Sequence, residues 1–362
     1  MPVQRKITRA VKVGSLTLGG GSRILIQSMT NAPAHDREGT LRQILELERA
    51  GCDIVRFTVP DSETVRYIEY YKSHSSVALV ADIHFDHRLA IECAEAGIDK
   101  LRINPGNIGG ADKVRQVAKA CIAHKVPIRI GVNSGSLEKR LLEKHGGPTP
   151  QALFESAADQ ARLLEDCGMR DIVISVKSSS VKTMIDANRL LSENTDYPLH
   201  LGVTEAGGER MGSIKSAVGI GSLICDGIGD TVRVSLSADV TREVEAARAI
   251  LLACGALESG IDVVSCPTCG RTRIDLIGIS DRLQKRVAEA DLKPKRLIKV
   301  AVMGCAVNGP GEAREADVGV AGGDGCALLF RKGEIIRKIP EEGIIDTLME
   351  ELERLIREDA AG

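Results

Sequence analysis

The chain has 362 residues, long enough for two domains or for one large barrel with an appended domain. Its 48 Lys and Arg residues nearly balance its 50 Asp and Glu residues, and only 2% of its residues are aromatic. With no global positive field and few stacking side chains, the composition argues against a nucleic-acid-binding protein and against attraction to an anionic membrane. The sequence shows no apolar signal segment and no apolar run of the roughly eighteen residues that a membrane helix needs, so we expect a cytoplasmic protein.

Residues 1–23 predict a small hairpin around Gly14-Ser15, leading into the first buried strand. From residue 24 onward, apolar β-branched runs alternate with segments of helical period, such as residues 40–50, 111–124, 150–167 and 241–254. The predicted strands are residues 24–30, 54–59, 77–85, 100–104, 127–133, 171–178, 199–205 and 231–237. Eight successive βα units fit a closed (β/α)8 barrel, and no Gly-x-Gly-x-x-Gly follows the first strand to support a dinucleotide fold.

After Cys254 this rhythm ends, and we place a domain boundary between residues 257 and 258. The TIM-barrel domain is expected to span residues 1–257, and a small α+β domain residues 258–362. The second domain is predicted to contain strands at 262–265, 296–303, 317–320, 327–331 and 334–339, a helix at 275–290 and a C-terminal helix from 341.

Four arginines lie within the predicted strands, toward the carboxyl ends: Arg56, Arg102, Arg129 and Arg233. A (β/α)8 barrel gathers these strand ends around one opening, where active sites lie. Because a buried guanidinium without a partner is costly and its fork of donors suits phosphate oxygens, we predict a strongly anionic substrate, most simply a diphosphate. The alternative is that each arginine pairs with a carboxylate of the core.

Further polar residues are predicted at the same opening: Asp82, His84, Asn104, Asn133, Lys177, Thr204, Glu205 and Ser235. Asp82 and His84 are two residues apart and therefore share a face of their strand. His84 could equally cap a loop. Glu205 is the best candidate for a general acid, with a pKa tuned by burial and by neighbouring cations, although an ion pair with Lys177 or Arg210 is the alternative.

Ten cysteines in a chain expected in the cytoplasm favour reduced thiols and metal chemistry over disulfides. Six of them lie in apolar contexts and are expected to be part of the core: Cys52, Cys93, Cys121, Cys167, Cys225 and Cys254.

Three other cysteines lie in turn-forming sequence, Cys266 and Cys269 in Ser-Cys-Pro-Thr-Cys-Gly and Cys305 in Gly-Cys-Ala-Val-Asn-Gly-Pro-Gly-Glu. This spacing lets thiolates from separate turns converge on one inorganic centre. Structural zinc usually takes a second close pair of Cys or His, and no His follows His200, whereas Glu312 stands seven residues after Cys305. We favour an iron–sulfur cluster over zinc and over cysteines that only pack, with Glu312 as a ligand more easily displaced than thiolate.

Five motifs together resemble bacterial 4-hydroxy-3-methylbut-2-enyl diphosphate synthases, in the short form that lacks the insertion of plant versions. They are Leu-Arg-Ile-Asn-Pro-Gly-Asn, Ile-Gly-Val-Asn-Ser-Gly-Ser-Leu, Gly-Val-Thr-Glu-Ala-Gly, Ser-Cys-Pro-Thr-Cys-Gly-Arg and Gly-Cys-Ala-Val-Asn-Gly-Pro-Gly-Glu. The resemblance implies an oxidoreductase of the non-mevalonate isoprenoid route that opens 2-C-methyl-D-erythritol 2,4-cyclodiphosphate by two-electron reduction and releases water. It implies a 4Fe-4S cluster on Cys266, Cys269, Cys305 and Glu312. It also implies substrate contacts and proton delivery by Arg56, Arg102, Arg129, Asn133, Lys177, Glu205, Arg233 and Ser235.

Each helix of a βα barrel returns the chain to the face opposite the opening, so the segment after Cys254 should leave at the bottom. We therefore expect a head-to-tail homodimer in which the cluster of one chain caps the barrel of another, as the resemblance also implies. No flavin or nicotinamide motif is visible, and the resemblance implies flavodoxin or ferredoxin as electron donor. Two alternatives remain at this point: a barrel transferase resembling dihydropteroate synthase with a structural zinc module, and a zinc-dependent regulatory or nucleic-acid-binding protein.

Overall fold

The computed structural model describes residues 4–290, 292–305 and 315–361, so the predicted ligand Glu312 lies outside the described residues. The chain divides into two compact units, Met1–Ala256 and Leu257–Gly362. Each unit has its own sheet and its own core, and each is described by itself.

The main sheet of the first unit consists of eight parallel strands: β3 (Leu25–Met29), β4 (Ile54–Thr58), β5 (Ala78–Asp82), β6 (Lys100–Ile103), β7 (Ile128–Asn133), β8 (Ile172–Lys177), β9 (His200–Leu201) and β10 (Thr231–Val232). Neighbours pair in chain order from β3 to β8, and β10 pairs with both β3 and β9. A parallel bridge between Ile174 and Leu199 joins β8 to β9. The ring is therefore complete, and the predicted (β/α)8 barrel is confirmed. The last two strands are shorter than predicted.

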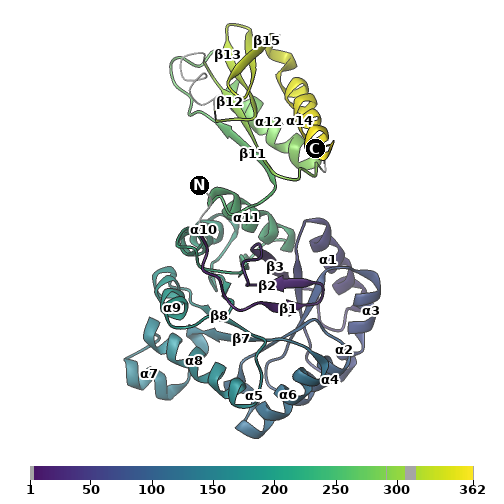
Figure 1. Ribbon diagram of the computed structural model, residues 1–362, viewed down its shortest axis with the longest axis vertical. Helices are drawn as coiled ribbons and strands as arrows, with labels where there is room; N and C mark the ends of the chain where they lie inside the picture. The colour runs from purple at the N-terminus through teal and green to yellow at the C-terminus, as the bar shows by residue number, and fades with distance from the viewer. Residues whose placement is uncertain (1–3, 291, 306–314, 362) are drawn as a thin grey trace. The chain divides into compact units, whose positions relative to one another are not determined.

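Helices surround the strands (Figure 1): α1 (Arg37–Arg49), α2 (Ser62–Val65), α3 (Tyr67–His74), α4 (His87–Glu95), α5 (Pro105–Ile108), α6 (Ala111–His124), α7 (Lys139–His145), α8 (Pro150–Asp166), α9 (Val181–Asn194), α10 (Glu209–Cys225) and α11 (Val240–Ala253). Six helices begin with a side-chain cap that accepts a hydrogen bond from a backbone N–H of the first turn, and the capping residues are Asp36, Asp61, Asp86, Thr149, Ser180 and Asp239. Five of these caps fix where the loops after β3, β4, β5, β8 and β10 become helices, and Thr149 caps α8 after α7.

A short hairpin, β1 (Val11–Val13) and β2 (Leu16–Leu18), closes the amino-terminal end of the barrel, as the sequence predicts. Its apolar side chains form one cluster with the first residues of the strands: Val11, Val13, Leu18, Leu25, Ile54, Ala78, Val80 and Val173. All of these residues are buried. Access to the barrel lumen must therefore come from the carboxyl ends of the strands.

The second unit contains β11 (Gly260–Ser265), β12 (Leu297–Met303), β13 (Val318–Gly323), β14 (Cys326–Arg331) and β15 (Glu334–Pro340), with α12 (Leu276–Glu289) and α14 (Ile344–Ala361). The first three strands are parallel, and β14 and β15 continue the sheet antiparallel. Leu283, Val300 and Leu352 are fully buried in a core that the two helices share with the sheet. Within the described part of the chain, no helix combines the length and apolar character needed to cross a membrane.

The six cysteines expected in the core do not share one environment. Cys52, Cys93 and Cys121 are buried, as predicted. The prediction was wrong for Cys225, which is exposed, and for Cys167 and Cys254, which are half-buried. These three stand at the carboxyl ends of helices α8, α10 and α11, where the chain turns back toward solvent.

Candidate active site: a cation-lined barrel opening

The strand register brings the predicted charged residues onto one face of the sheet. Asp82 is in register with Arg102, and Arg102 with Arg129, so their side chains project to the same side of β5, β6 and β7. Arg129 lies close enough to Arg56 and Arg233, from β4 and the end of β10, for each to lower its pKa. Because strands from opposite sides of the ring contribute to this group, the shared face is the barrel lumen.

Asp82 is the centre of the first charge cluster. It is buried, and its carboxylate lies 3.1 Å from Arg102 Nη1, 3.7 Å from Arg56 Nε and 3.6 Å from His84 Nε2. Burial alone would raise the pKa of Asp82, but Arg56 and Arg102 hold it below its usual value. One carboxylate therefore orients two guanidinium groups, while half of the His84 side chain remains exposed at the rim.

Glu243 of α11 is the second luminal carboxylate. Its oxygens accept hydrogen bonds from Arg233 Nη2 at 3.1 Å, from Ser28 Oγ at 2.7 Å and from the Leu236 N–H at 3.1 Å. These bonds fix the Arg233 guanidinium beside β3 and the loop after β10. Glu243 could not be predicted from the sequence, because its helical position does not reveal which face of α11 meets the barrel.

These pairs correct the expectation that all four arginines lack a partner. Arg56 and Arg102 share Asp82, and Arg233 has Glu243. Arg129 differs: it is 1% exposed, and its Nε and Nη2 atoms have no hydrogen-bond partner among the described residues. Burial, followed by the neighbouring arginines, lowers the pKa of Arg129. Because a guanidinium stays protonated at neutral pH, it remains a buried charge that calls for an anion.

Lys177 shows the same imbalance. It is buried, and burial together with Arg233 and Arg129 lowers its pKa well below the usual value. In the described chain it forms no ion pair. Two glycines make room for the cations, since a Cβ on Gly131 would stand 2.7 Å from Arg102 Nε and one on Gly202 would stand 2.7 Å from Lys177 Nζ. Any side chain at either position would push a cation aside.

A deeper polar layer was missed by the sequence reasoning. Lys100 is fully buried with its Nζ 3.4 Å from Gln27 Oε1, and His200 is fully buried with its Nδ1 2.7 Å from Thr231 Oγ1. Burial is the main cause that lowers the pKa of both Lys100 and His200 well below the usual values. The available signal was spacing, because Lys100 precedes Arg102 by two residues and so shares its face.

Among the residues that the structure describes, six basic side chains therefore converge on two carboxylates. The cations are Arg56, Lys100, Arg102, Arg129, Lys177 and Arg233, and the carboxylates are Asp82 and Glu243. Such an excess of buried positive charge is costly in an empty barrel and is offset when a polyanion binds.

The remaining predicted residues lie at the outer edge of the lumen. Asn104 is buried, whereas Asn133, Thr204 and Ser235 are half-buried. Glu205 is exposed rather than buried as expected, and in the described chain it forms no ion pair with Lys177 or Arg210. Its φ of 52° lies in the left-handed region, which a side chain adopts at a cost of about 1–3 kcal/mol. Strain of this kind often marks a functional position.

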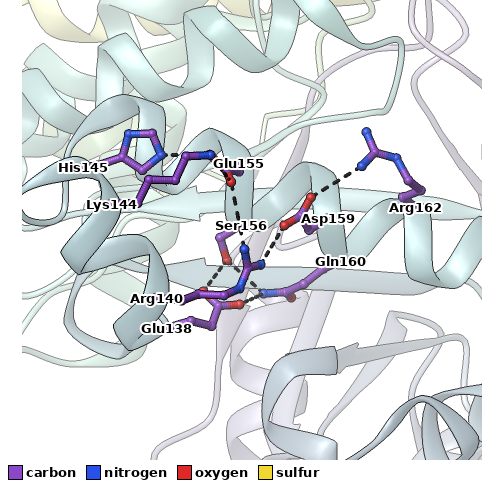
Figure 2. A network of polar contacts seen from close by, with 9 residues as sticks. All are labelled: Glu138, Arg140, Lys144, His145, Glu155, Ser156, Asp159, Gln160 and Arg162. Carbon is purple, nitrogen blue, oxygen red and sulfur yellow. Dashed lines mark hydrogen bonds and ion pairs between the residues drawn. The ribbon is translucent and has the colours of Figure 1, made fainter.

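The loop that follows Asn133 is tied to the outside of the barrel. Glu138 accepts hydrogen bonds from Ser156 Oγ at 2.9 Å and Gln160 Nε2 at 3.3 Å, and both donors are buried residues of α8. Figure 2 shows these contacts beside further ion pairs that join α7 to α8, among them Arg140 with Asp159 at 2.7 Å. The anchoring fixes the chain that leaves β7 directly after Asn133.

In the second unit, Cys266 and Cys305 follow the neighbouring parallel strands β11 and β12. The Gly304 N–H donates to Cys266 Sγ at 3.3 Å, a contact typical of cluster thiolates. Cys269 lies in the same turn as Cys266, and the methyl group of Thr272 in that turn would be 3.0 Å from a Cβ on Gly304. Two thiol-bearing turns thus meet at Gly304, which fits a thiolate-bound centre. The described residues do not include a preassembled group of three or more metal ligands, and Glu312 lies outside them.

The fold and the site define a (β/α)8-barrel protein with a cation-lined lumen and a separate thiol-bearing domain. The family model described as "GcpE TIM-barrel domain" matches residues 8–248, and the one described as "GcpE protein C-terminal domain" matches residues 262–354. The chain belongs to this family, which confirms the resemblance seen in the sequence. The family is iron–sulfur dependent, and this favours a cluster over zinc at the cysteine turns.

Curated relatives match over nearly the whole chain. A protein of Clostridium perfringens is 54% identical over 353 residues, covering 98% of this chain and 100% of the relative, and one of Caldanaerobacter subterraneus is 52% identical over 355 residues, covering 98% and 99%. Both are named 4-hydroxy-3-methylbut-2-en-1-yl diphosphate synthase (flavodoxin). A solved type I 3-dehydroquinate dehydratase of Clostridium difficile shares only the barrel fold, with 13% identity, a TM-score of 0.52 and coverage of 69% of this chain and 100% of that one.

Proposed function

We propose that this chain reduces 2-C-methyl-D-erythritol 2,4-cyclodiphosphate to 4-hydroxy-3-methylbut-2-enyl diphosphate, the reaction for which its relatives are named. Two electrons and two protons enter, the cyclic diphosphate opens at carbon and one water leaves. The observation that carries the proposal is the excess of luminal cations over carboxylates, because the guanidinium forks suit phosphate oxygens and a diphosphate offsets part of that positive charge.

Two groups of luminal cations would bind the diphosphate in different ways. Arg56, Arg102 and Arg233 are held by carboxylates, so their donor forks are oriented before the substrate arrives. Arg129 and Lys177 add positive charge that forms no close ion pair with a carboxylate among the described residues. When the ring opens, the phosphate released from carbon gains negative charge, and cations already in place stabilise that charge more than they stabilise the closed ring.

Asn133, Thr204 and Ser235 lie at the outer edge of the lumen and can donate hydrogen bonds to the carbon skeleton and its hydroxyl groups. Glu205, held in a strained conformation beside them, would deliver a proton to the departing hydroxyl. Glu205→Gln should bind substrate normally and turn over slowly. Normal turnover by this variant would remove the acid role.

Cys266, Cys269, Cys305 and Glu312 would hold the 4Fe-4S cluster, which supplies the two electrons when bound. The Gly304 N–H at Cys266 Sγ would stabilise negative charge on that sulfur. Reducing equivalents would come from a flavodoxin or a ferredoxin, the first of which appears in the names of the relatives.

The direct test is anaerobic turnover of the cyclodiphosphate by the iron–sulfur-loaded chain with a low-potential chemical reductant, followed by phosphorus NMR. The open diphosphate should form with the unaltered chain and not with Cys266→Ser. Brown, cluster-loaded protein that leaves the cyclodiphosphate unchanged under these conditions would refute the proposal.

We further propose that the working form is a head-to-tail homodimer in which each barrel is served by the partner's cysteine turns. The geometry of the barrel supports this arrangement. Arg248, near the end of α11, lies beside Gly51, which precedes β4 at the end of the barrel opposite the cations. The last helix of the barrel therefore ends on the face opposite the opening. A mixture of Arg129→Met chains and Cys266→Ser chains, each inactive alone, should regain about a quarter of normal activity, since half of the dimers are mixed and each has one intact composite site. No recovery after verified subunit exchange would contradict the arrangement.

A further inference from the structure

Two thiols outside the active site lie next to each other at the ends of adjacent helices. Cys225 is the last residue of α10, and Cys254 is the C-cap of α11. The Cys254 thiol donates to the Gly221 carbonyl of α10, with 3.7 Å between sulfur and oxygen, and it lies close enough to Cys225 for that thiol to affect its pKa. Cys225 is exposed and Cys254 is half-buried, so small reagents can reach the pair.

Helix geometry places the two sulfur atoms together independently of that bond. Gly221 and Cys225 are four residues apart and therefore lie one above the other on one face of α10. A helical side chain points back toward the amino terminus, so the Cys225 sulfur covers the turn that contains Gly221. A Cβ on Gly221 would stand 3.5 Å from Cys254 Sγ, which shows that the second sulfur packs on the same turn.

We propose that Cys225 and Cys254 are a dithiol–disulfide pair, a redox modification site that cross-links α10 to α11 when hydrogen peroxide oxidises it. Peroxide converts the Cys225 thiolate to a sulfenic acid and leaves as hydroxide. The Cys254 sulfur then attacks the Cys225 sulfur, the S–S bond forms and the sulfenic oxygen leaves as water. Overall, two thiols lose two electrons and two protons, and one peroxide becomes two waters.

The surroundings set the order and the speed of these steps. Burial, and then the neighbouring Cys225, raises the pKa of Cys254 to about 11, so the exposed Cys225 is the thiol that meets peroxide first. Both residues stand at carboxyl ends of helices and not at a helix amino terminus, the position that activates many catalytic thiols. The reaction is therefore slower than at an activated catalytic thiol, and Cys254 acts as the resolving partner.

The cross-link would form close to the boundary between the two units. Cys254 precedes Ala256, the last residue of the first unit, by only two positions. A disulfide requires the two Cα atoms to stand about 4.4–6.8 Å apart, so oxidation would pin the end of α11 to α10. The chain segment that leads into the second unit would then start from a fixed point.

A second pair of cysteines provides an internal control. Cys93 of α4 and Cys121 of α6 are neighbours whose thiols interact, but both are completely buried. Burial raises the pKa of Cys121 to about 12 and that of Cys93 further still. We expect this pair to stay reduced as long as the protein is folded.

The experiment treats the folded full-length chain with graded peroxide, unfolds it in denaturant with an alkylating reagent that blocks every free thiol, and digests it with trypsin and a glutamate-specific protease. Cleavage after Glu258 separates Cys254 from Cys266 and Cys269, so peptide 216–233 linked to peptide 249–258 identifies the bond. The linked pair should appear in the folded protein, lose its link on treatment with dithiothreitol and be accompanied by fully alkylated Cys93 and Cys121.

Two variants decide between a true pair and independent oxidation. In Cys254→Ser, Cys225 should pass to the sulfinic acid because nothing resolves its sulfenic acid, whereas in the wild-type chain it should not. In Cys225→Ser, Cys254 should remain alkylatable at peroxide levels that oxidise the wild type. The proposal is overturned if wild-type Cys225 becomes sulfinic while Cys254 stays free, or if the linked peptides form only after unfolding.

Discussion

The two ends of the barrel are built from the same eight strands and yet have opposite energetics. At the amino-terminal end, the β1–β2 hairpin packs Val11, Val13 and Leu18 against the strand beginnings, and the cluster is wholly apolar. At the carboxyl end, alternate strand positions carry cations that outnumber the carboxylates around them. The first arrangement stabilises the free protein, and the second destabilises it until an anion binds.

In this barrel, the residues that stabilise the fold and the residues predicted to bind the anion lie at opposite ends of the strands. Apolar burial at one end holds the ring closed, which allows the other end to keep Arg129 and Lys177 without a close ion pair in the part of the chain that the structure describes. Barrels in general place catalysis at the carboxyl ends and stability at the opposite end. Substitutions at the two ends should therefore change the free energy of unfolding in opposite directions and by different amounts.

The largest effect is expected for Arg129→Met. The change removes a buried charge that has unpaired donors, so the free energy of unfolding should rise by about 1–4 kcal/mol, while affinity for the diphosphate substrate should fall by about 2–5 kcal/mol. Denaturant unfolding and calorimetric titration measure the two quantities. If Arg129→Met lowered the free energy of unfolding, Arg129 would be a structural residue, and the two ends of the barrel would not differ in their effect on stability.

At the opposite end, Leu18→Ala should lower the free energy of unfolding by about 2–5 kcal/mol, since Leu18 is completely buried. Affinity for the substrate should stay unchanged in the folded fraction, because the hairpin lies away from the cations. The same two measurements apply. Weakened binding in folded Leu18→Ala protein would show that the two ends are coupled.

A pH effect is expected at the cationic end through Lys177. Burial and nearby cations lower the pKa of Lys177, so between that value and the usual lysine pKa of about 10.4 the unfolded chain binds more protons than the folded one. The stability contribution of Lys177 therefore increases as pH rises through this window, and it is least favourable below it, where the folded lysine is charged.

A bound diphosphate favours the charged lysine and reverses this shift. Calorimetric titration between about pH 7 and 10, in buffers of different ionisation enthalpy, should therefore show proton uptake on binding. Lys177→Met should take up fewer protons, and Lys100→Met tests the second buried lysine in the same way. Uptake that is identical in both variants and the wild type would exclude the lysines as its source.

The smallest effect is expected outside the lumen, at the anchor of the loop after β7. Glu138→Ala removes the acceptor for buried Ser156 and Gln160 donors, which should cost about 1–3 kcal/mol of stability and raise KM for the substrate more than it lowers kcat. Glu138→Gln keeps one acceptor oxygen, so its KM should lie between the KM of the Ala variant and that of the wild type. Equal changes in KM for Ala and Gln would argue against positioning of Asn133 by this contact.

Much of the site could be predicted from local sequence. Arg56, Arg102, Arg129 and Lys177 stand at strand positions whose direction follows from the two-residue period, so a barrel prediction suffices to bring them together. The identity of their partners could not be predicted in this way. Asp82 reaches across to Arg102 because β5 and β6 are neighbours in the ring, and Glu243 reaches Arg233 and Ser28 because α11 packs over β10 and β3.

The sequence by itself determined the eight βα units, the cation-bearing strand ends, the two cysteine turns and, through its motifs, the family. Each of these depends on residues that are close along the chain, where hydrophobic period and spacing are direct signals. Only the tertiary structure decided that Arg129 keeps two donor atoms without a hydrogen-bond partner among the described residues, and that Lys100 and His200 are buried. It also decided that Glu205 is exposed and strained and that Cys225 lies beside Cys254. These features arise from contacts between segments far apart in the sequence, whose energies depend on burial and neighbouring charge rather than on residue type.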